Sequence, residues 1–160
     1  MSTPRYRNLG DGTIRDTDSG LYWMAAPLGF PETGRRRWRW PAWLRRLRDG
    51  ISHQRHPTTE EPAGLYPWEE AWRAVEAFNQ AGGCGGYQDG RWPNRGELKT
   101  LLDRPRHRAA FPVAIKGRYW TCWPHRNPRY AWFVDFDTGQ TGYLSKDARL
   151  QVRLVRRRGT

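Results

Sequence analysis

Cysteine is scarce in this sequence: only Cys84 and Cys122 occur among its 160 residues. Two cysteines cannot build the multi-bridge framework that stabilises many small secreted domains. They could form one disulfide if the protein were exported, but without an export signal we expect both to be reduced and partly buried. The two cysteines and four histidines show no zinc-binding spacing, so we expect neither a metal nor another cofactor.

Long apolar runs are also missing. No stretch approaches the roughly 20 residues needed to cross a bilayer, and the first residues, MSTPRYRNLGDGT, lack the apolar core of a signal peptide. We therefore expect a cytoplasmic protein. At this length a single domain over residues 1–160 is the simplest organisation, and ten Trp, seven Tyr and five Phe supply apolar area for one core.

Acidic residues are few relative to basic ones. The chain has 28 Lys and Arg against 16 Asp and Glu, which gives a net charge of +12. Such an excess concerns partners rather than fold, and it favours polyanions: nucleic acid, anionic membranes, sulfated glycans or acidic proteins. An arginine-rich composition without any binding role is the alternative.

The stretch that organises the chain runs from Trp68 to Leu102 and reads WEEAWRAVEAFNQAGGCGGYQDGRWPNRGELKTLL. After Pro67, apolar residues recur at helical spacing (Trp68, Ala71, Trp72, Val75 and Phe78) until a Gly-Gly pair ends the pattern, which predicts a helix. Asn94 and Glu97 form a capping-box pattern, which predicts a second helix. The glycine-rich and Trp-Pro residues between them predict a rigid corner.

Alternating apolar and polar residues predict strands on both sides of this stretch. They cover residues 6–16, 21–24, 114–123, 130–136 and 141–145. Tyr130, Trp132, Val134 and Phe136 are expected to face one way. In the last strand, Leu150, Val152, Leu154 and Arg156 are expected to share a face.

The corner sequence GGYQDGRWPNRGEL resembles the GGYSDWRLPT segment of the Lcl C-terminal domain family, a family of bacterial domains. Four further blocks resemble that family in the same order: YRNLGDGTIRDTDSGLYW at 6–23, YW at 119–120, YAWFVDFDTGQTGYLSK at 130–146 and VRLVR at 152–156. The resemblance implies a C-type-lectin-like fold related to that of the formylglycine-generating enzymes. We therefore expect an α+β, loop-rich domain with two helices on a small, twisted, mostly antiparallel sheet, and with its terminal strands paired.

Residues 29–62 lie outside the resemblance and predict a basic insertion with a short amphipathic helix. Seven Arg occur between positions 35 and 48 without one acidic residue. Arg can pair with phosphate and Trp can stack on bases, so a polyanion-binding face is predicted. It comprises Arg35, Arg36, Arg37, Trp38, Arg39, Trp40, Arg45, Arg46 and Arg48, together with Arg104, Arg106 and Arg108. The helix could instead lie on an anionic membrane or cover part of the core.

Catalysis is not expected. Cys122 and His125 are three residues apart, as a nucleophile and its base could be, but a third orienting group is not evident. The formylglycine-generating enzymes use two copper-bound cysteines, whereas the Lcl family usually has Ser at the position of Cys122. Asp135 and Asp137 could contribute to a calcium site, but too few carboxylates accompany them.

These patterns predict a non-catalytic module that docks a polyanion through the Arg/Trp-rich insertion. Nucleic acid, alone or in a ribonucleoprotein assembly, is the favoured partner. Three alternatives remain: an adhesin-like module that binds sulfated glycans or another protein, a membrane-surface binder, and a copper- and cysteine-dependent oxidase-like enzyme.

Overall fold

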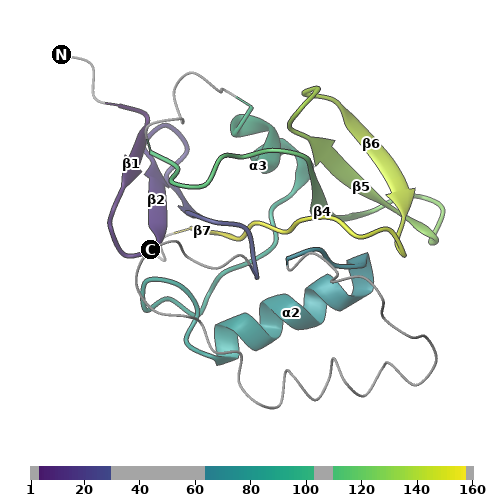
Figure 1. Cartoon of the computed structure of the whole chain (residues 1–160), viewed down its shortest axis with the longest axis horizontal. Coiled ribbons are helices and arrows are strands. Elements are labelled where there is room, and N and C mark those ends of the chain that lie inside the picture. Colours follow the sequence, from purple (N-terminus) through teal and green to yellow (C-terminus); the bar gives the residue numbers. More distant parts are fainter. Residues whose placement is uncertain (1–3, 30–63, 103–109, 158–160) are drawn as a thin grey trace, which may run out of the picture.

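Two small antiparallel sheets carry the strands of the protein (Figure 1). The computed structural model describes residues 4–29, 64–102 and 110–157. The first sheet has the order β1-β2-β3-β7 and the second β4-β5-β6. The strands are β1 Tyr6–Asn8, β2 Thr13–Asp16, β3 Leu21–Met24, β4 Arg118–Pro124, β5 Tyr130–Asp135, β6 Thr141–Ser145 and β7 Val155–Arg157, and the described helices are α2 Trp68–Gln80 and α3 Arg95–Thr100. The expected α+β class with two helices is confirmed, but the strands form two sheets rather than one. The C-terminal strand β7 joins the N-terminal strands by pairing with β3, while the first strand, β1, lies at the far edge of the same sheet.

Residues 150–155 run between the two sheets and join them. Their backbone hydrogen bonds reach five other parts of the chain: Leu150 pairs with Tyr66, Gln151 with Arg118 and Trp120, Val152 with Leu28, Leu154 with Met24, and Val155 with Arg91. Alternation predicted one buried face here, but the consecutive side chains from Val152 to Val155 are all buried. Both faces are covered because Val152 and Leu154 pack in a cluster with residues of α2 and with Trp92, whereas Arg153 lies over Phe111 and Tyr119.

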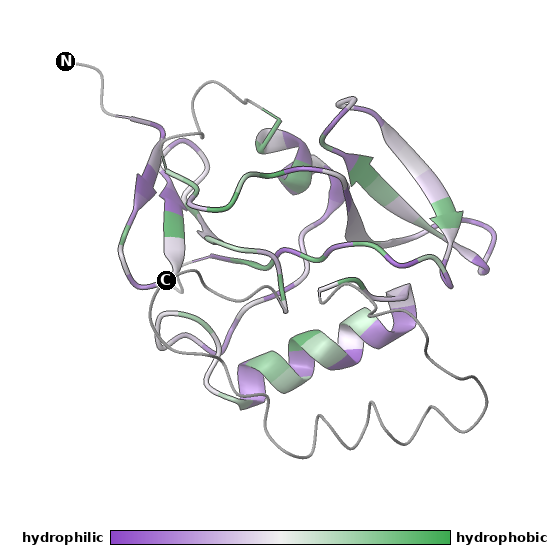
Figure 2. Cartoon of the chain, in the orientation of Figure 1, coloured by the Kyte–Doolittle hydropathy of each residue, from purple (hydrophilic) through white to green (hydrophobic). Residues whose placement is uncertain are grey.

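Helix α2 packs an apolar face against the core. Trp68, Ala71 and Val75 are buried, as their spacing predicts, and the hydropathy pattern along the helix is visible in Figure 2. Trp72 is the exception, because 42% of its surface is exposed. Pro67 is the N-cap residue rather than the first helical residue.

The glycine-rich residues after α2 make the tight turn that the sequence predicts. Gly85 and Gly86 have φ values of 60° and 79°. Positive φ at both central residues is the requirement of a type I′ turn, which only glycine and a few polar residues meet easily. Cys84 and Tyr87 close the turn with two backbone hydrogen bonds of 3.1 and 2.9 Å.

The second half of this corner is tied to its surroundings. The side-chain amide of Asn79 donates to the carbonyl of Gly90 (2.7 Å), and the carbonyl of Pro93 accepts a hydrogen bond from β4 (3.0 Å). The ring of Trp92 is buried and stacks on Trp68, with 5.5 Å between centroids. The corner therefore holds α2, β4 and the beginning of α3 in fixed relation.

The predicted capping box starts α3. Asn94 accepts a hydrogen bond from the backbone N–H of Glu97 (2.8 Å), and the Glu97 carboxylate accepts one from the backbone N–H of Asn94 (3.0 Å). The same carboxylate pairs with both terminal nitrogens of Arg91. Leu98 is fully buried, and α3 packs on β4 and β5.

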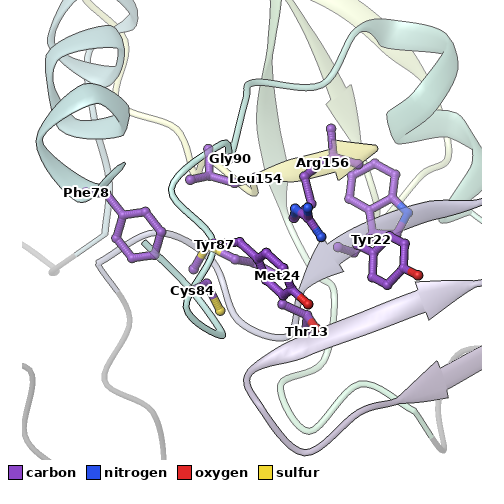
Figure 3. Close-up of a pocket in the computed structure, with 11 residues that line it drawn as sticks. Thr13, Tyr22, Met24, Phe78, Cys84, Tyr87, Gly90, Leu154 and Arg156 are labelled. Carbon is purple, nitrogen blue, oxygen red and sulfur yellow. The ribbon is translucent and has the colours of Figure 1, made fainter. Parts of the chain in front are cut away.

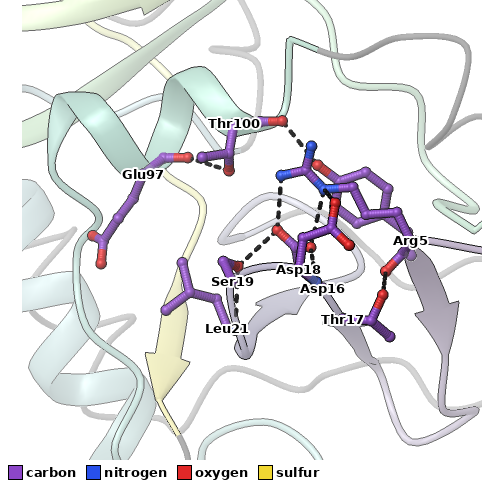
Figure 4. A network of polar contacts seen from close by, with 9 residues as sticks. Arg5, Asp16, Thr17, Asp18, Ser19, Leu21, Glu97 and Thr100 are labelled. Carbon is purple, nitrogen blue, oxygen red and sulfur yellow. Dashed lines mark hydrogen bonds and ion pairs between the residues drawn. The ribbon is translucent and has the colours of Figure 1, made fainter.

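A buried carboxylate fixes the first sheet (Figure 4). Asp16 is fully buried and accepts hydrogen bonds from Arg5 (3.0 and 3.1 Å), Ser19 (2.7 Å) and the backbone N–H of Asp18. Burial alone raises the pKa of Asp16, but these hydrogen bonds and the charge of Arg5 outweigh it and leave the pKa below its ordinary value.

Substitution of Gly83 should destabilise the protein more than that of Gly86. Both residues have positive φ. A Cβ atom added at Gly83 would lie 1.8 Å from the carbonyl oxygen of Tyr87, whereas a Cβ atom added at Gly86 would have no atom within 4 Å among those described. We expect Gly86→Ala to cost about 1 kcal/mol and Gly83→Ala at least about 3 kcal/mol, measured by urea unfolding. Equal losses would show that the turn relaxes around the new methyl group.

Asp16→Asn should lower stability near neutral pH by roughly 2 kcal/mol. Because the pKa of Asp16 is depressed in the fold, its ionised form stabilises the protein above the ordinary carboxyl pKa, and this contribution is lost as pH falls through the folded value. The variant should therefore show a flatter loss of stability between about pH 5 and pH 2. Asp18→Asn is the matched control: Asp18 lies 3.4 Å from Arg5 but its side chain is 58% exposed, so its loss should cost under about 0.5 kcal/mol. Similar effects of the two substitutions would contradict the assignment.

Candidate functional site

The predicted polyanion-binding residues lie outside the described residues. This applies to Arg35, Arg36, Arg37, Trp38, Arg39, Trp40, Arg45, Arg46 and Arg48, and equally to Arg104, Arg106 and Arg108. Only the neighbouring chain can be placed. A Cβ atom added to Gly29 would lie 3.1 Å from the Cα of Gly64, so the described chain leaves and returns at one place, beside the start of α2. The basic loop follows Leu102 at the end of α3 and precedes Ala110, whose carbonyl accepts a hydrogen bond from Asn8 of β1.

Among the described residues, no hydrogen bond joins the side chains of Cys122 and His125, which make separate contacts. The Cys122 thiol is half-buried, and its pKa is raised chiefly by burial and further by the negative charge of Glu97. His125 Nδ1 accepts a hydrogen bond from the backbone N–H of Asn127 (3.2 Å), and its ring stacks on Tyr143. A thiol with a raised pKa is a poor nucleophile near neutral pH.

Asp135 and Asp137, which were considered as calcium ligands, lie at a turn that the side chain of Asp135 stabilises. Asp135 accepts hydrogen bonds from the backbone N–H groups of Asp137 (2.9 Å) and Thr138 (3.2 Å), and its other oxygen pairs with Arg118 (3.2 Å). Within residues 4–29, 64–102 and 110–157, no group of three or more His, Cys, Asp or Glu side chains is placed to hold a metal ion. None of the described helices is long and apolar enough to cross a membrane.

A small pocket lies beside the glycine corner (Figure 3). It has a volume of about 20 Å³, which accommodates one water molecule rather than an organic ligand. The guanidinium of Arg156 lies 3.7 Å from the ring centroid of Tyr87 and 5.4 Å from that of Tyr22, and it pairs with Asp89 at 2.7 Å. The pocket therefore marks the place where the corner is fastened to β7.

Arg153 is the other unusual cation. It is fully buried, and desolvation lowers its pKa. One terminal nitrogen donates to the carbonyl of Met24 (2.6 Å), and the guanidinium lies over the rings of Phe111 and Tyr119. Its Nε and Nη2 have no hydrogen-bond partner in the part of the chain that the structure describes. Ring faces and one carbonyl thus accommodate this charge inside the core.

The second sheet carries a cluster of partly exposed rings, which we call the aromatic face: Trp123, His125, Tyr130, Trp132 and Tyr143. His125 stacks on Tyr143 with 4.3 Å between centroids and an interplanar angle of 21°. Trp132 and Tyr130 meet the edge or face of Tyr143 at 5.6 and 5.8 Å. Each ring therefore contacts another ring, except Trp123, which joins the cluster through Arg95.

Strand register and helix position explain this arrangement. Trp132 of β5 lies directly opposite Tyr143 of β6, so their side chains leave the sheet on the same side. Arg95 is the first residue of α3, and its guanidinium lies 4.8 Å from the ring centroid of Trp132 and 5.8 Å from that of Trp123. Trp123 is 46% exposed and Tyr143 52% exposed.

Positive charge lies on the aromatic face and in the adjoining turn between β4 and β5. Arg95 lies over its rings, and Arg126 and Arg129 lie in the turn between β4 and β5, both exposed. None of the three has a carboxylate within ion-pair distance among the residues that the structure describes. The face therefore combines flat apolar rings with cations that no described carboxylate neutralises.

Sequence reasoning identified only part of this face. The alternation of β5 places Tyr130 and Trp132 on one side of the strand, as predicted. It could not bring His125, Tyr143 or Arg95 to the same place, because that depends on hairpin register and on the packing of α3. The available signal was Tyr130 and Trp132 at alternate positions in the first strand of the predicted hairpin, together with Tyr143 in the second strand.

A family model for the Lcl C-terminal domain matches residues 12–156 of the chain. The match extends from the start of β2 into β7 and includes both described helices and the aromatic face. No curated protein matches the chain.

Cys122 should react slowly with alkylating reagents. In a Cys84→Ser variant, where Cys122 is the remaining thiol, iodoacetamide should modify it more slowly near pH 7.5 than it modifies free cysteine. Burial disfavours the thiolate that attacks the reagent. Unfolding in urea should restore the ordinary rate, which provides the control. A rate in the folded protein above that of free cysteine would identify an activated thiol and contradict this expectation.

Proposed function

The chain belongs to the Lcl C-terminal domain family, whose fold is C-type-lectin-like, and from this premise we propose that it is a non-catalytic binding module that docks a polyanion. Nucleic acid, free or within a ribonucleoprotein assembly, is the partner that we infer. A lectin-like fold serves many functions, so the proposal depends on the chemistry of its surface rather than on the fold.

One observation carries the proposal: partly exposed rings occur together with Arg95, Arg126 and Arg129, which have no carboxylate within ion-pair distance among the described residues, whereas several other cations of the described fold are paired. Lys146 pairs with Glu69, Arg91 with Glu97, Arg118 with Asp135, Arg156 with Asp89, and Arg5 with Asp16 and Asp18. Arg95, Arg126 and Arg129 therefore keep their charge available to a partner. Guanidinium groups bind phosphate and sulfate in a fixed geometry, which favours a polyanion.

The Arg-rich insertion belongs to the same proposal. No acidic residue lies among its seven Arg at positions 35–48, and these Arg add to the excess that gives the chain its net charge of +12. Charge of this size attracts polyanions over distances of about a Debye length, which is roughly 8 Å at physiological salt. A cytoplasmic location is also part of the proposal.

The absence of catalysis is also proposed. The raised pKa of Cys122 and the involvement of His125 in a ring stack both argue against a cysteine–histidine mechanism. Replacing Cys122 by Ser and His125 by Ala in one variant would abolish such a mechanism, so an activity that disappears in that variant while its fold persists would refute this part.

A sulfated glycan bound by an adhesin-like module is the second candidate. The lectin-like fold favours it, and both aromatic rings and Arg can contact a sulfated sugar. The two candidates share an anionic ligand and differ in whether bases are present. A membrane-surface role and a copper-dependent cysteine activity have less support from the described contacts.

Replacing Arg126 and Arg129 together by Ala should weaken polyanion binding and flatten its salt dependence. Each lost phosphate contact should reduce the slope of log K against log salt by about 0.7 to 0.9. Fluorescence anisotropy with labelled RNA, DNA and heparin over a range of salt concentrations measures both quantities. A second variant tests the insertion. It should also weaken binding and flatten the salt dependence, and in it Ala replaces Arg35, Arg36, Arg37 and Arg39.

The matched control replaces Arg15 and Arg73 by Ala, because both are exposed and the variant has the same net charge as the Arg126/Arg129 variant. It should retain the parent slope if contacts at the face matter. If both double variants weaken binding equally, the loss of net charge explains the effect and contacts at the face do not. A parent protein that binds none of the three ligands at low salt would show that the proposed function is wrong.

A further inference from the structure

We propose that the aromatic face binds unpaired bases of a single-stranded nucleic acid, with Trp123 and Tyr143 as stacking surfaces and Arg95 as the phosphate contact. This inference rests on the proposed polyanion function and specifies its ligand and its site. The argument uses the exposure of the rings, their mutual contacts and the charge beside them.

The exposure of these rings is not explained by the hydrophobic core. The two core clusters of the described residues contain neither Trp123 nor Tyr143. About half of each ring surface remains in contact with water, which is unfavourable for such large apolar groups. Exposed aromatic clusters with a polar rim are typical of binding surfaces. The two rings therefore lie where a ligand can reach them.

The face is also held in place before any ligand binds. Tyr143 contacts three other rings, those of His125, Tyr130 and Trp132. The loop that carries His125 is closed by a hydrogen bond from its backbone N–H to the carbonyl of Tyr130 (3.0 Å). A ring fixed by its neighbours loses little conformational entropy when a base stacks on it. This arrangement favours stacking over adaptable hydrogen bonding.

Arg95 places a positive charge next to the exposed rings. Its guanidinium lies within 6 Å of the ring centroids of both Trp123 and Trp132, so a phosphate bound there would lie next to the rings. Because Arg95 begins α3 after a capping box, its backbone position is fixed. Arg126 and Arg129 extend the positive surface along the β4–β5 turn, where a nucleic-acid backbone could continue.

Stacking distinguishes single strands from the other polyanions. The faces of bases in a duplex are covered by their neighbours, so exposed protein rings can stack on bases only where the bases are unpaired. Sequence-tolerant stacking on aromatic side chains beside cationic groups is the usual means of binding single strands. A duplex or heparin would use the cations but would gain little from the rings.

The test compares the full chain with ring variants, using labelled oligo(dT) of about 15 nucleotides, a duplex of equal length and heparin. Trp123→Ala and Tyr143→Ala should each weaken oligo(dT) binding roughly 5- to 150-fold. Binding of the duplex and of heparin should change less than about twofold, and the salt slope for oligo(dT) should stay at the parent value because no phosphate contact is lost. Arg95→Ala should weaken all three ligands and reduce the slope.

Trp72→Ala is the matched control, since Trp72 is 42% exposed but lies on α2, where its ring contacts Trp68 and Trp92 and none of the rings of the aromatic face. This variant should bind oligo(dT) as the parent does. Trp123→Leu and Tyr143→Leu keep apolar bulk without a ring, and they replace any Ala variant whose thermal unfolding shows loss of the fold. They should lose oligo(dT) affinity like the Ala variants.

The outcomes separate the two proposals. If the parent binds heparin and duplex but the ring variants bind oligo(dT) as tightly as the parent, the stacking site is wrong while the polyanion function stands. If the ring variants lose heparin as strongly as oligo(dT), the face binds sulfated glycan and the inference is overturned. If the parent binds no polyanion, the proposed function fails and this inference fails with it.

Discussion

The fold depends on the backbone hydrogen bonds that residues 150–155 make with other parts of the chain. This segment is covered on both sides, so an unpaired N–H or carbonyl there would cost free energy comparable to a lost hydrogen bond. It meets the requirement by bonding to Tyr66, Arg118, Trp120, Leu28, Met24 and Arg91 in turn. These bonds join one segment to both sheets and to the corner. The position of β4, and therefore of the aromatic face, follows from this pairing.

The position of α3 depends on the same segment, because the glycine-rich corner connects the two. Backbone pairing of Arg91 with Val155 fixes the residues that precede the helix, and the Arg91 side chain holds Glu97 of the capping box. Glu97 thus has two roles: its carboxylate holds Arg91 of the corner, and it also takes part in the capping box that begins α3. Because α3 is short and begins at Arg95, it covers only part of the second sheet. The remaining rings are left in contact with water, with a guanidinium at their border.

Local signals predicted much of this fold from the sequence. Asn94 and Glu97 predicted α3, the glycines predicted the turn at Cys84, and alternation predicted β5 with Tyr130 and Trp132 on one face. Non-local packing decided the rest: the two-sheet division, the exposure of Trp72 and the burial of Arg153 depend on segments far apart in sequence. The aromatic face depends on register between strands and on α3, so sequence patterns supplied its members but not their association. The predicted basic face falls on residues outside those described.

Two of the exposed large hydrophobic residues, Trp123 and Tyr143, belong to the aromatic face, and they can be compared with the arginines of the fold. Buried Arg153 shows that this fold can accommodate a guanidinium internally on ring faces and a carbonyl, without a carboxylate among the described residues. Arg95 is different, because its rings are partly exposed and its charge faces a surface that a ligand can reach. An arginine stacked on a half-exposed tryptophan gains little for folding, since water already solvates both groups well. The same pair gains more when a ligand with both a flat ring and a negative charge excludes that water, because cation–π and ionic contacts strengthen on desolvation.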